Sequence, residues 1–262
     1  LVYGEVGTAG KLVTMVAGTH GDEGPWSALA IKGLLQHPVD QLKGRIRVIF
    51  TANALAAEVN ARNSWIDSPN PLDLDSCFPG DPDGSHSERL AAAMTPLLTD
   101  SEVIIDLHGG GSWCVNAFVK RFEGSERIAE DMEAPFISKG PNKPGGLTSY
   151  ARTLGIQVTN VEVGGRSKDE MLWVVRNVKG LERVLYNLGV LDLPTPPPPA
   201  KKAVEVDHID AVRARMGGIF VPPCGKKLWV QLYQPEPRWG RCWIYTPWKN
   251  WKYSRPPMSK QP

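Results

Sequence analysis

An apolar run at residues 12–17 leads directly into the segment Gly-Thr-His-Gly-Asp-Glu-Gly at 18–24. The run is partly β-branched and predicts a buried strand, and apolar residues recur at helical spacing over 26–34. The chain therefore passes from strand to helix through a glycine-flanked turn that carries a histidine and two carboxylates. In open α/β sheets, ligands bind at the carboxyl ends of the strands, so this turn is a candidate binding site.

The same order of strand, histidine and glycines returns at residues 103–111. Residues 103–107 predict a short buried strand, which delivers His108 into a run of glycines. A third β-rich run, 156–163, ends at a pair of glycines and places Glu162 near a strand end. Three predicted strands therefore end in polar side chains of the kind that bind metals or move protons.

Strand and helix signals alternate through the first two thirds of the chain. A strand is expected at 45–51, and helices are expected at 85–98 and 168–188. This alternation predicts an α/β fold with three α/β/α layers around a mixed central sheet.

The organisation changes at residues 194–201, where a proline-rich sequence predicts a stiff, extended linker. We therefore assign residues 1–193 to the α/β domain and residues 202–262 to a small C-terminal β domain. A short strand at 204–209 is expected to belong to the latter. From Trp229 onwards, tryptophans occur among prolines and basic residues without strand alternation, which favours a disordered tail over an aromatic binding surface.

The 262-residue chain has 42% hydrophobic and 22% charged residues, which is ordinary for a soluble globular protein. A net charge of +2 gives no reason to expect nucleic acid or a membrane surface as a partner, and no apolar run approaches the roughly 20 residues that span a bilayer. The four cysteines lie far apart and lack CxxC spacing. We therefore expect free thiols and a cytoplasmic location.

His20 and Glu23, three residues apart, form an incomplete metal site. One imidazole nitrogen and one carboxylate oxygen leave room for a third protein ligand and for water, as in catalytic zinc sites. This pair alone is more often an ordinary polar turn. His108 would complete a ligand set of two histidines and one glutamate, and Glu162 would supply the general base. In isolation, His108 could instead be a core or capping histidine, and Glu162 a surface carboxylate.

Five short segments support the metal site because they follow one another in a recognisable order. They are His20-Gly21-Asp22-Glu23, Asn53 to Arg62, Asp73-Leu74-Asp75-Ser76-Cys77-Phe78-Pro79-Gly80, Ile105 to His108, and Val161 to Gly165. Together they resemble the succinylglutamate desuccinylase/aspartoacylase family of the zinc carboxypeptidase superfamily, over roughly residues 12–191. The resemblance implies a zinc-carboxypeptidase-like α/β/α fold and makes a homo-oligomer an expectation.

The resemblance also implies a set of site residues. His20, Glu23 and His108 stand where the family binds zinc, one ion per chain. Glu162 stands at the position of the general base and acid, and Arg62 at that of the arginine that polarises the scissile carbonyl and stabilises the oxyanion. The bond broken would be an amide of a small N-acylated amino acid or a related compound, as in a deacylase.

One segment departs from the family pattern. Where many members have Asp-Leu-Asn-Arg, this chain has Asp-Leu-Asp-Ser at 73–76. An acid and a hydroxyl thereby replace a cationic clamp for a substrate carboxylate. We expect Asp75 and Ser76 to contact the substrate, which would present an amine or a neutral polar group there. Alternatively, Arg152 or Arg166 supplies the missing positive charge.

Two other functions stay open at the level of sequence. The chain could be a carboxypeptidase-like amidohydrolase, which would cleave peptides with free C-termini. It could also be a catalytically silent relative that binds a ligand through the altered pocket. Metal analysis and the substrate range distinguish these from a deacylase.

Overall fold

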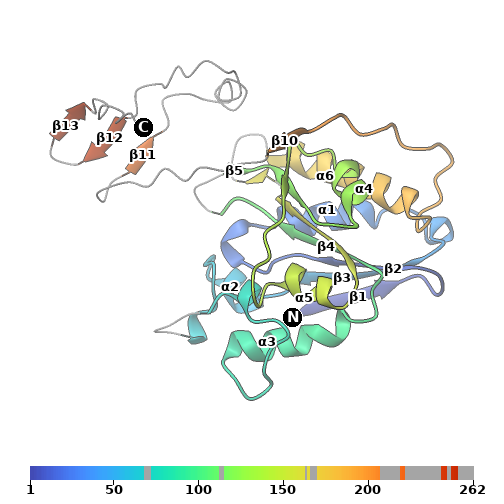
Figure 1. Ribbon diagram of the computed structural model, residues 1–262, viewed down its shortest axis with the longest axis horizontal. Coiled ribbons are helices and arrows are strands. Elements are labelled where there is room, and N and C mark those ends of the chain that lie inside the picture. The colour runs from blue at the N-terminus through green and yellow to red at the C-terminus, as the bar shows by residue number, and fades with distance from the viewer. Residues whose placement is uncertain are drawn as a thin grey trace, which may run out of the picture. The chain divides into compact units, whose positions relative to one another are not determined.

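The computed structural model describes residues 1–67, 72–111, 115–162, 164–165 and 170–206, together with 219–221, 243–246 and 249–252. The chain divides into two units, Leu1–His208 and Ile209–Pro262. The first unit contains a large sheet with helices packed against it (Figure 1). The candidate site lies entirely in this unit.

Eight strands form the central sheet, in the order β1-β3-β2-β4-β8-β6-β7-β10. The neighbours β3, β2, β4 and β8 run parallel, whereas β1 is antiparallel to β3 and β6 is antiparallel to β8. The sheet is therefore mixed, as predicted. Its strands are β1 (Val2–Val6), β2 (Leu12–Val16), β3 (Arg45–Thr51), β4 (Val103–His108), β6 (Phe118–Arg121), β7 (Phe136–Lys139), β8 (Gln157–Glu162) and β10 (Val204–Val206); β5 (Val115–Asn116) and β9 (Gly164–Gly165) form a separate pair.

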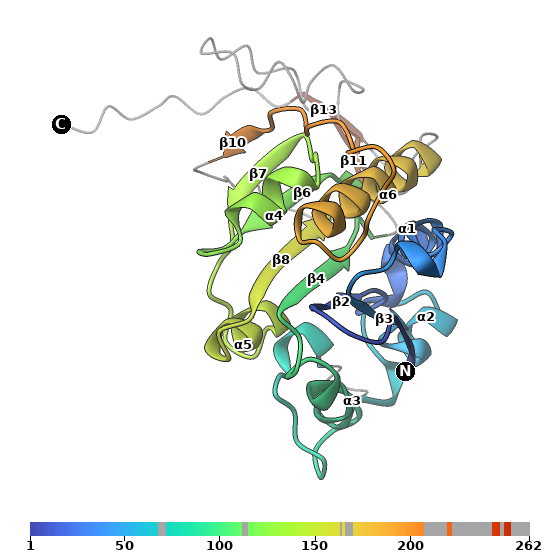
Figure 2. The same cartoon turned by 90° about the vertical axis from the view of Figure 1, so that its right-hand side faces the viewer.

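Helices cover both faces of the sheet (Figure 2). α1, α4 and α6 share a hydrophobic core with one face, and α3 and α5 share a second core with the other. The predicted three-layer α/β/α architecture is confirmed. The helices are α1 (Trp26–Leu34), α2 (Ala54–Glu58), α3 (His86–Met94), α4 (Glu126–Asp131), α5 (Leu147–Thr153) and α6 (Glu170–Asn187), with 3-10 turns η1 (Gly21–Glu23), η2 (Val39–Gln41), η3 (Trp65–Asp67), η4 (Leu74–Ser76) and η5 (Thr95–Leu97).

Burial explains the sequence of the two central strands. Every residue of β2 and β4 is buried, because parallel strands between two helical layers have no solvent-facing side. The start of α3 has an equally local cause: Ser85 and Glu88 form a capping box, in which each side chain accepts a hydrogen bond from the backbone N–H of the other.

The end of the first unit differs from the domain boundary that we expected at residue 193. Val204–Val206 forms β10, which pairs in parallel with β7 and so belongs to the central sheet instead of the small β domain. The proline-rich segment is held against this unit as well, because the Nε of Arg183 donates a hydrogen bond to the carbonyl of Pro198. Neither interaction produces a periodic sequence signal, so proline content alone indicated a linker.

The described residues of the second unit form a small antiparallel sheet. It consists of β11 (Ile219–Val221), β12 (Trp243–Thr246) and β13 (Lys249–Lys252). β12 and β13 lie within the tryptophan-rich stretch, where the sequence shows no strand alternation. The expectation of a disordered tail otherwise concerns residues outside the described ranges. Among the helices that the structure describes, none is both long and apolar enough to cross a membrane.

Candidate metal centre

The histidine turn at 18–24 lies at the carboxyl end of β2. His20 has an extended backbone and precedes the short turn η1, which contains Glu23. The turn packs tightly against α2, because a Cβ on Gly21 would lie only 2.0 Å from the carbonyl carbon of Ala56. A larger residue at position 21 would therefore displace the turn. In this tight arrangement, His20 Nδ1 lies 2.7 Å from Glu23 Oε1.

His108 reaches the same place from the neighbouring strand. β2 and β4 run parallel and pair directly, so both strands end at the same edge of the sheet. His108 Nδ1 lies 3.2 Å from His20 Nδ1 and 3.2 Å from Glu23 Oε2. One ligand atom from each of the three residues lies within 4.8 Å of the others. Two imidazole nitrogens and a carboxylate fit zinc, so the donor set suits the expected ion.

A second layer of carboxylates lies beside both imidazoles. His20 Nε2 lies 2.9 Å from Asp73 Oδ1, and His108 Nε2 lies 3.0 Å from Asp106 Oδ1. Each ring therefore has one nitrogen beside a carboxylate while its Nδ1 faces Glu23. Metal-ligating histidines usually show this arrangement, because the outer carboxylate fixes the tautomer and the ring orientation.

The electrostatics of the centre favour a bound cation. Burial raises the pKa of Glu23, but hydrogen bonds from His108 and His20 outweigh burial and hold that pKa at about 2. Burial lowers the pKa of both histidines, yet their carboxylate partners raise each pKa above the ordinary value. The centre thus favours positive charge. Without a metal ion, protons on the two histidines supply this charge, and a bound metal ion would displace those protons.

Arg62 lies at the rim of the centre. Its Nη2 donates to Asp73 Oδ2 at 3.1 Å, and its Nη1 lies 3.5 Å from Glu23 Oε1. The side chain is half exposed, so the guanidinium faces both the buried carboxylates and solvent. This position is compatible with the oxyanion role expected for Arg62.

Glu162 ends the third strand of the site. β8 pairs in parallel with β4, and Glu162 is the register partner of His108. Its side chain is 9% exposed, and its Oε1 lies 3.5 Å from the Nζ of Lys120. The sheet therefore brings the expected base next to the histidine strand, across one strand spacing.

Asp75 and Ser76 lie in η4, close to the outer carboxylate Asp73. Asp75 Oδ2 lies 3.0 Å from Lys143 Nζ, and Asp75 Oδ1 accepts the backbone N–H of Leu147 at 3.1 Å. Lys143 Nζ also lies 3.6 Å from Asp73 Oδ2. Lys143, from the loop before α5, thus places a positive charge beside this segment. Of the arginines we considered for this role, Arg152 stacks on Phe122 at 5.4 Å, and residue 166 lies outside the described ranges.

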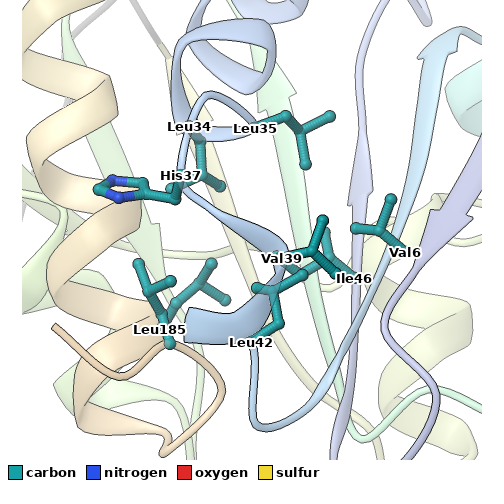
Figure 3. A pocket seen from close by; sticks show the side chains of 9 residues that line it. Val6, Leu34, Leu35, His37, Val39, Leu42, Ile46 and Leu185 are labelled. Carbon is teal, nitrogen blue, oxygen red and sulfur yellow. The ribbon is translucent and has the colours of Figure 1, made fainter.

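An apolar cleft elsewhere in the fold does not belong to this centre (Figure 3). Its lining includes Leu34, Ile46 and Leu185, and His37 lies at its edge with Nε2 2.8 Å from Glu182 Oε1. Ile46 is at the amino end of β3, whereas the metal centre follows the carboxyl ends of β2 and β4. With a volume near 50 Å³, the cleft is also too small for a typical ligand.

Sequence reasoning missed the charged partners of the site. Asp106 offered a signal, because it is a carboxylate inside an apolar strand and lies two residues before His108, on the same face. Asp73 was part of a motif but had no assigned role. Lys143 and Lys120 gave no signal, since each meets its partner only through the tertiary fold.

Comparisons with known proteins identify the family and the fold of this chain. Residues 9–185 match the model of the succinylglutamate desuccinylase/aspartoacylase catalytic domain. An N-alpha-acetyl-L-2,4-diaminobutyric acid deacetylase from Halomonas elongata is 34% identical over 103 residues, which cover 39% of this chain and 29% of that protein. The match therefore spans less than a third of the curated deacetylase.

Solved structures show the same fold at low identity. A succinylglutamate desuccinylase from a Silicibacter species has a TM-score of 0.75 and 21% identity, covering 96% of this chain and 79% of that one. The product-bound ectoine utilization protein from Ruegeria pomeroyi has a TM-score of 0.66 and 22% identity, covering 77% of this chain and 63% of that one. The family match includes all five motifs and spans more than half of the sequence, and so the chain belongs to the succinylglutamate desuccinylase/aspartoacylase family.

Proposed function

We propose that this protein hydrolyses the amide bond of a small N-acylated amino acid, with one zinc ion held by His20, Glu23 and His108. The observation that carries the proposal is the meeting of these three side chains at the ends of two parallel strands, with Glu162 ending the next strand. The family match and the deacetylase relative support a deacylase.

The residues of the centre divide the chemistry between them. When bound, zinc supplies a Lewis acid and lowers the pKa of the attacking water. Glu162 accepts the proton of that water and returns it to the leaving amine. Arg62 places its guanidinium at the rim, where negative charge develops on the carbonyl oxygen. Asp73 and Asp106 keep the two imidazoles turned towards Glu23.

We further propose that Asp75, with Ser76 beside it, receives a positively charged group of the substrate. In the free protein the carboxylate of Asp75 faces the ammonium of Lys143, whose side chain is 38% exposed. A substrate amine can take the place of that ammonium while Lys143 turns into solvent. The Halomonas elongata relative is named for a substrate with a free amine, N-alpha-acetyl-L-2,4-diaminobutyric acid, which supports this assignment.

The test compares hydrolysis of N-acetyl amino acids that differ only in the side chain, with zinc content measured on the same sample. N-acetyl-2,4-diaminobutyrate should be cleaved best, N-acetyl-2-aminobutyrate less well and N-acetyl-aspartate poorly. Asp75→Asn should remove the preference for the amine. Efficient cleavage of N-acetyl-aspartate alone would contradict the role of Asp75 but keep the deacylase.

The same measurements address the two alternative functions. Cleavage of peptides with free C-termini, without deacylation, would indicate a carboxypeptidase-like enzyme. Absence of both stoichiometric zinc and hydrolysis would indicate a silent ligand-binding relative and would overturn the proposal.

A further inference from the structure

Three neighbouring strands carry a row of polar side chains next to the metal centre. The strands β4, β8 and β6 lie side by side (Figure 2). β4 and β8 pair Asp106 with Asn160 and His108 with Glu162, and β8 and β6 pair Asn160 with Lys120. The residues that alternate with them, Leu107, Val161 and Val119, are all buried in the core shared with α1 and α6. Because side chains alternate between the two faces of a sheet, the polar row lies on the opposite face.

Lys120 connects this row to the expected base. Its Nζ lies 3.5 Å from Glu162 Oε1, diagonally across the β6–β8 pair. The exposed fractions are 29% for the lysine side chain and 9% for the glutamate. A carboxylate that has lost most of its water is costly to keep ionised unless a charge or hydrogen bond compensates it. Lys120 supplies such a charge.

The fold holds Lys120 in place on two sides. Its carbonyl oxygen accepts a hydrogen bond from the hydroxyl of Thr159 at 3.0 Å, and its ammonium lies 5.7 Å from the centre of the Phe118 ring. Arg62, by contrast, contacts Glu23 and Asp73 on the metal-ligand side. The two cations therefore serve different carboxylates of the site.

We infer that Lys120 is a positioning residue for Glu162: across the β6–β8 pair, its ammonium holds the carboxylate in the orientation needed for proton transfer. The inference rests on the proposed function and deepens it. In this inference Lys120 acts through Glu162 and not directly on substrate or metal. Its loss should therefore lower kcat and leave KM and zinc content unchanged.

The experiment compares Lys120→Met with Arg121→Met, which removes the next cation of the same strand. Arg121 pairs with Glu205 of β10, so its loss also breaks an ion pair between strands but one that does not involve Glu162. For Lys120→Met we expect kcat to fall on the order of 10- to 100-fold, the cost of misplacing a reacting group. Lys120→Arg should restore most of the rate, and Arg121→Met should keep wild-type kcat.

The outcomes separate the possible roles of Lys120. A rise in KM at unchanged kcat would mean that Lys120 binds substrate, and unchanged kcat and KM would mean that it is dispensable; either result overturns the inference. A fall in kcat that Lys120→Arg does not restore, together with a lower melting temperature, would indicate a purely structural role and would also overturn it.

A readout without turnover keeps this inference separate from the proposed function. Crystal structures of the wild type and Lys120→Met should show the Glu162 carboxylate leaving its position beside β6 in the variant. If the wild type hydrolysed no N-acyl amino acid, the proposed function would fail, and these structures would still decide the role of Lys120. A carboxylate that stays in place in the variant would refute it.

Discussion

Asp73 Oδ1 lies 2.9 Å from His20 Nε2, while Asp73 Oδ2 accepts a hydrogen bond from Arg62. One carboxylate thus contacts both an imidazole that we assign to the metal and the arginine that we assign to the oxyanion. The proposed metal site and the arginine assigned to the oxyanion are therefore connected through Asp73.

Replacing Asp73 should weaken zinc binding. In Asp73→Ala the His20 ring loses the partner that fixes its orientation, and we expect zinc affinity to fall on the order of 10- to 100-fold. Competition with a chromophoric chelator measures this. Asp75→Ala is the matched control, because the partners of Asp75 are Lys143 and Leu147 and not a histidine. Equal losses in both variants would argue against an orienting role for Asp73.

Removing the base should separate metal binding from turnover. Glu162→Gln has nearly the same shape but accepts no proton, so zinc should remain stoichiometric while kcat falls about 10²- to 10⁴-fold. Metal analysis and steady-state kinetics on one preparation provide the test. Glu182→Gln on α6 serves as control, since Glu182 pairs with His37 at the apolar cleft. Near-wild-type turnover by Glu162→Gln would exclude this residue as the base.

Asp67 should make the start of α3 sensitive to acid. Burial raises the pKa of its carboxyl, but hydrogen bonds from the Ser87 hydroxyl and from the backbone N–H groups of His86 and Ser87 lower it below the ordinary value. A lowered folded-state pKa means that the carboxylate stabilises the fold at neutral pH, and that this contribution is lost as pH falls below about 4. Urea unfolding between pH 3 and 7 should show a shallower loss of stability on acidification in Asp67→Asn.

Core packing on the α6 side should matter for stability without involving the centre. Leu181 is fully buried, and Leu181→Ala should lower the free energy of unfolding by about 2–5 kcal/mol. Leu172 lies on the same helix but is 68% exposed, so Leu172→Ala should change stability by less than about 0.5 kcal/mol. Denaturant unfolding of both variants measures the difference. Equal effects would mean that helix propensity, not burial, sets the cost.

The sequence predicted the parts of the fold that depend on local patterns. The buried strands β2 and β4 are visible as apolar runs, and Ser85 with Glu88 marks the start of α3. His20, Glu23 and His108 could be grouped because parallel strands end at one edge of a sheet and because the motifs resemble a known family. Periodicity and motif order were sufficient for these features.

Interactions between distant segments could not be predicted in this way. Lys143 contacts Asp75, which lies 68 residues away in the sequence. Lys120 contacts Glu162 only because β6 pairs with β8 in the tertiary fold. A lysine in a loop or a short strand has no spacing that indicates its partner. The same reason explains β10, since three residues carry no usable period.

The pairing of β10 with β7 has a practical meaning for anyone producing this protein. A protein shortened at residue 193, just before the proline-rich stretch, would lose both β10 and the segment that is hydrogen-bonded to Arg183. The backbone groups of β7 that face β10 would then become an open edge, which favours self-association through added strands. The shortest soluble fragment should therefore extend through Val206.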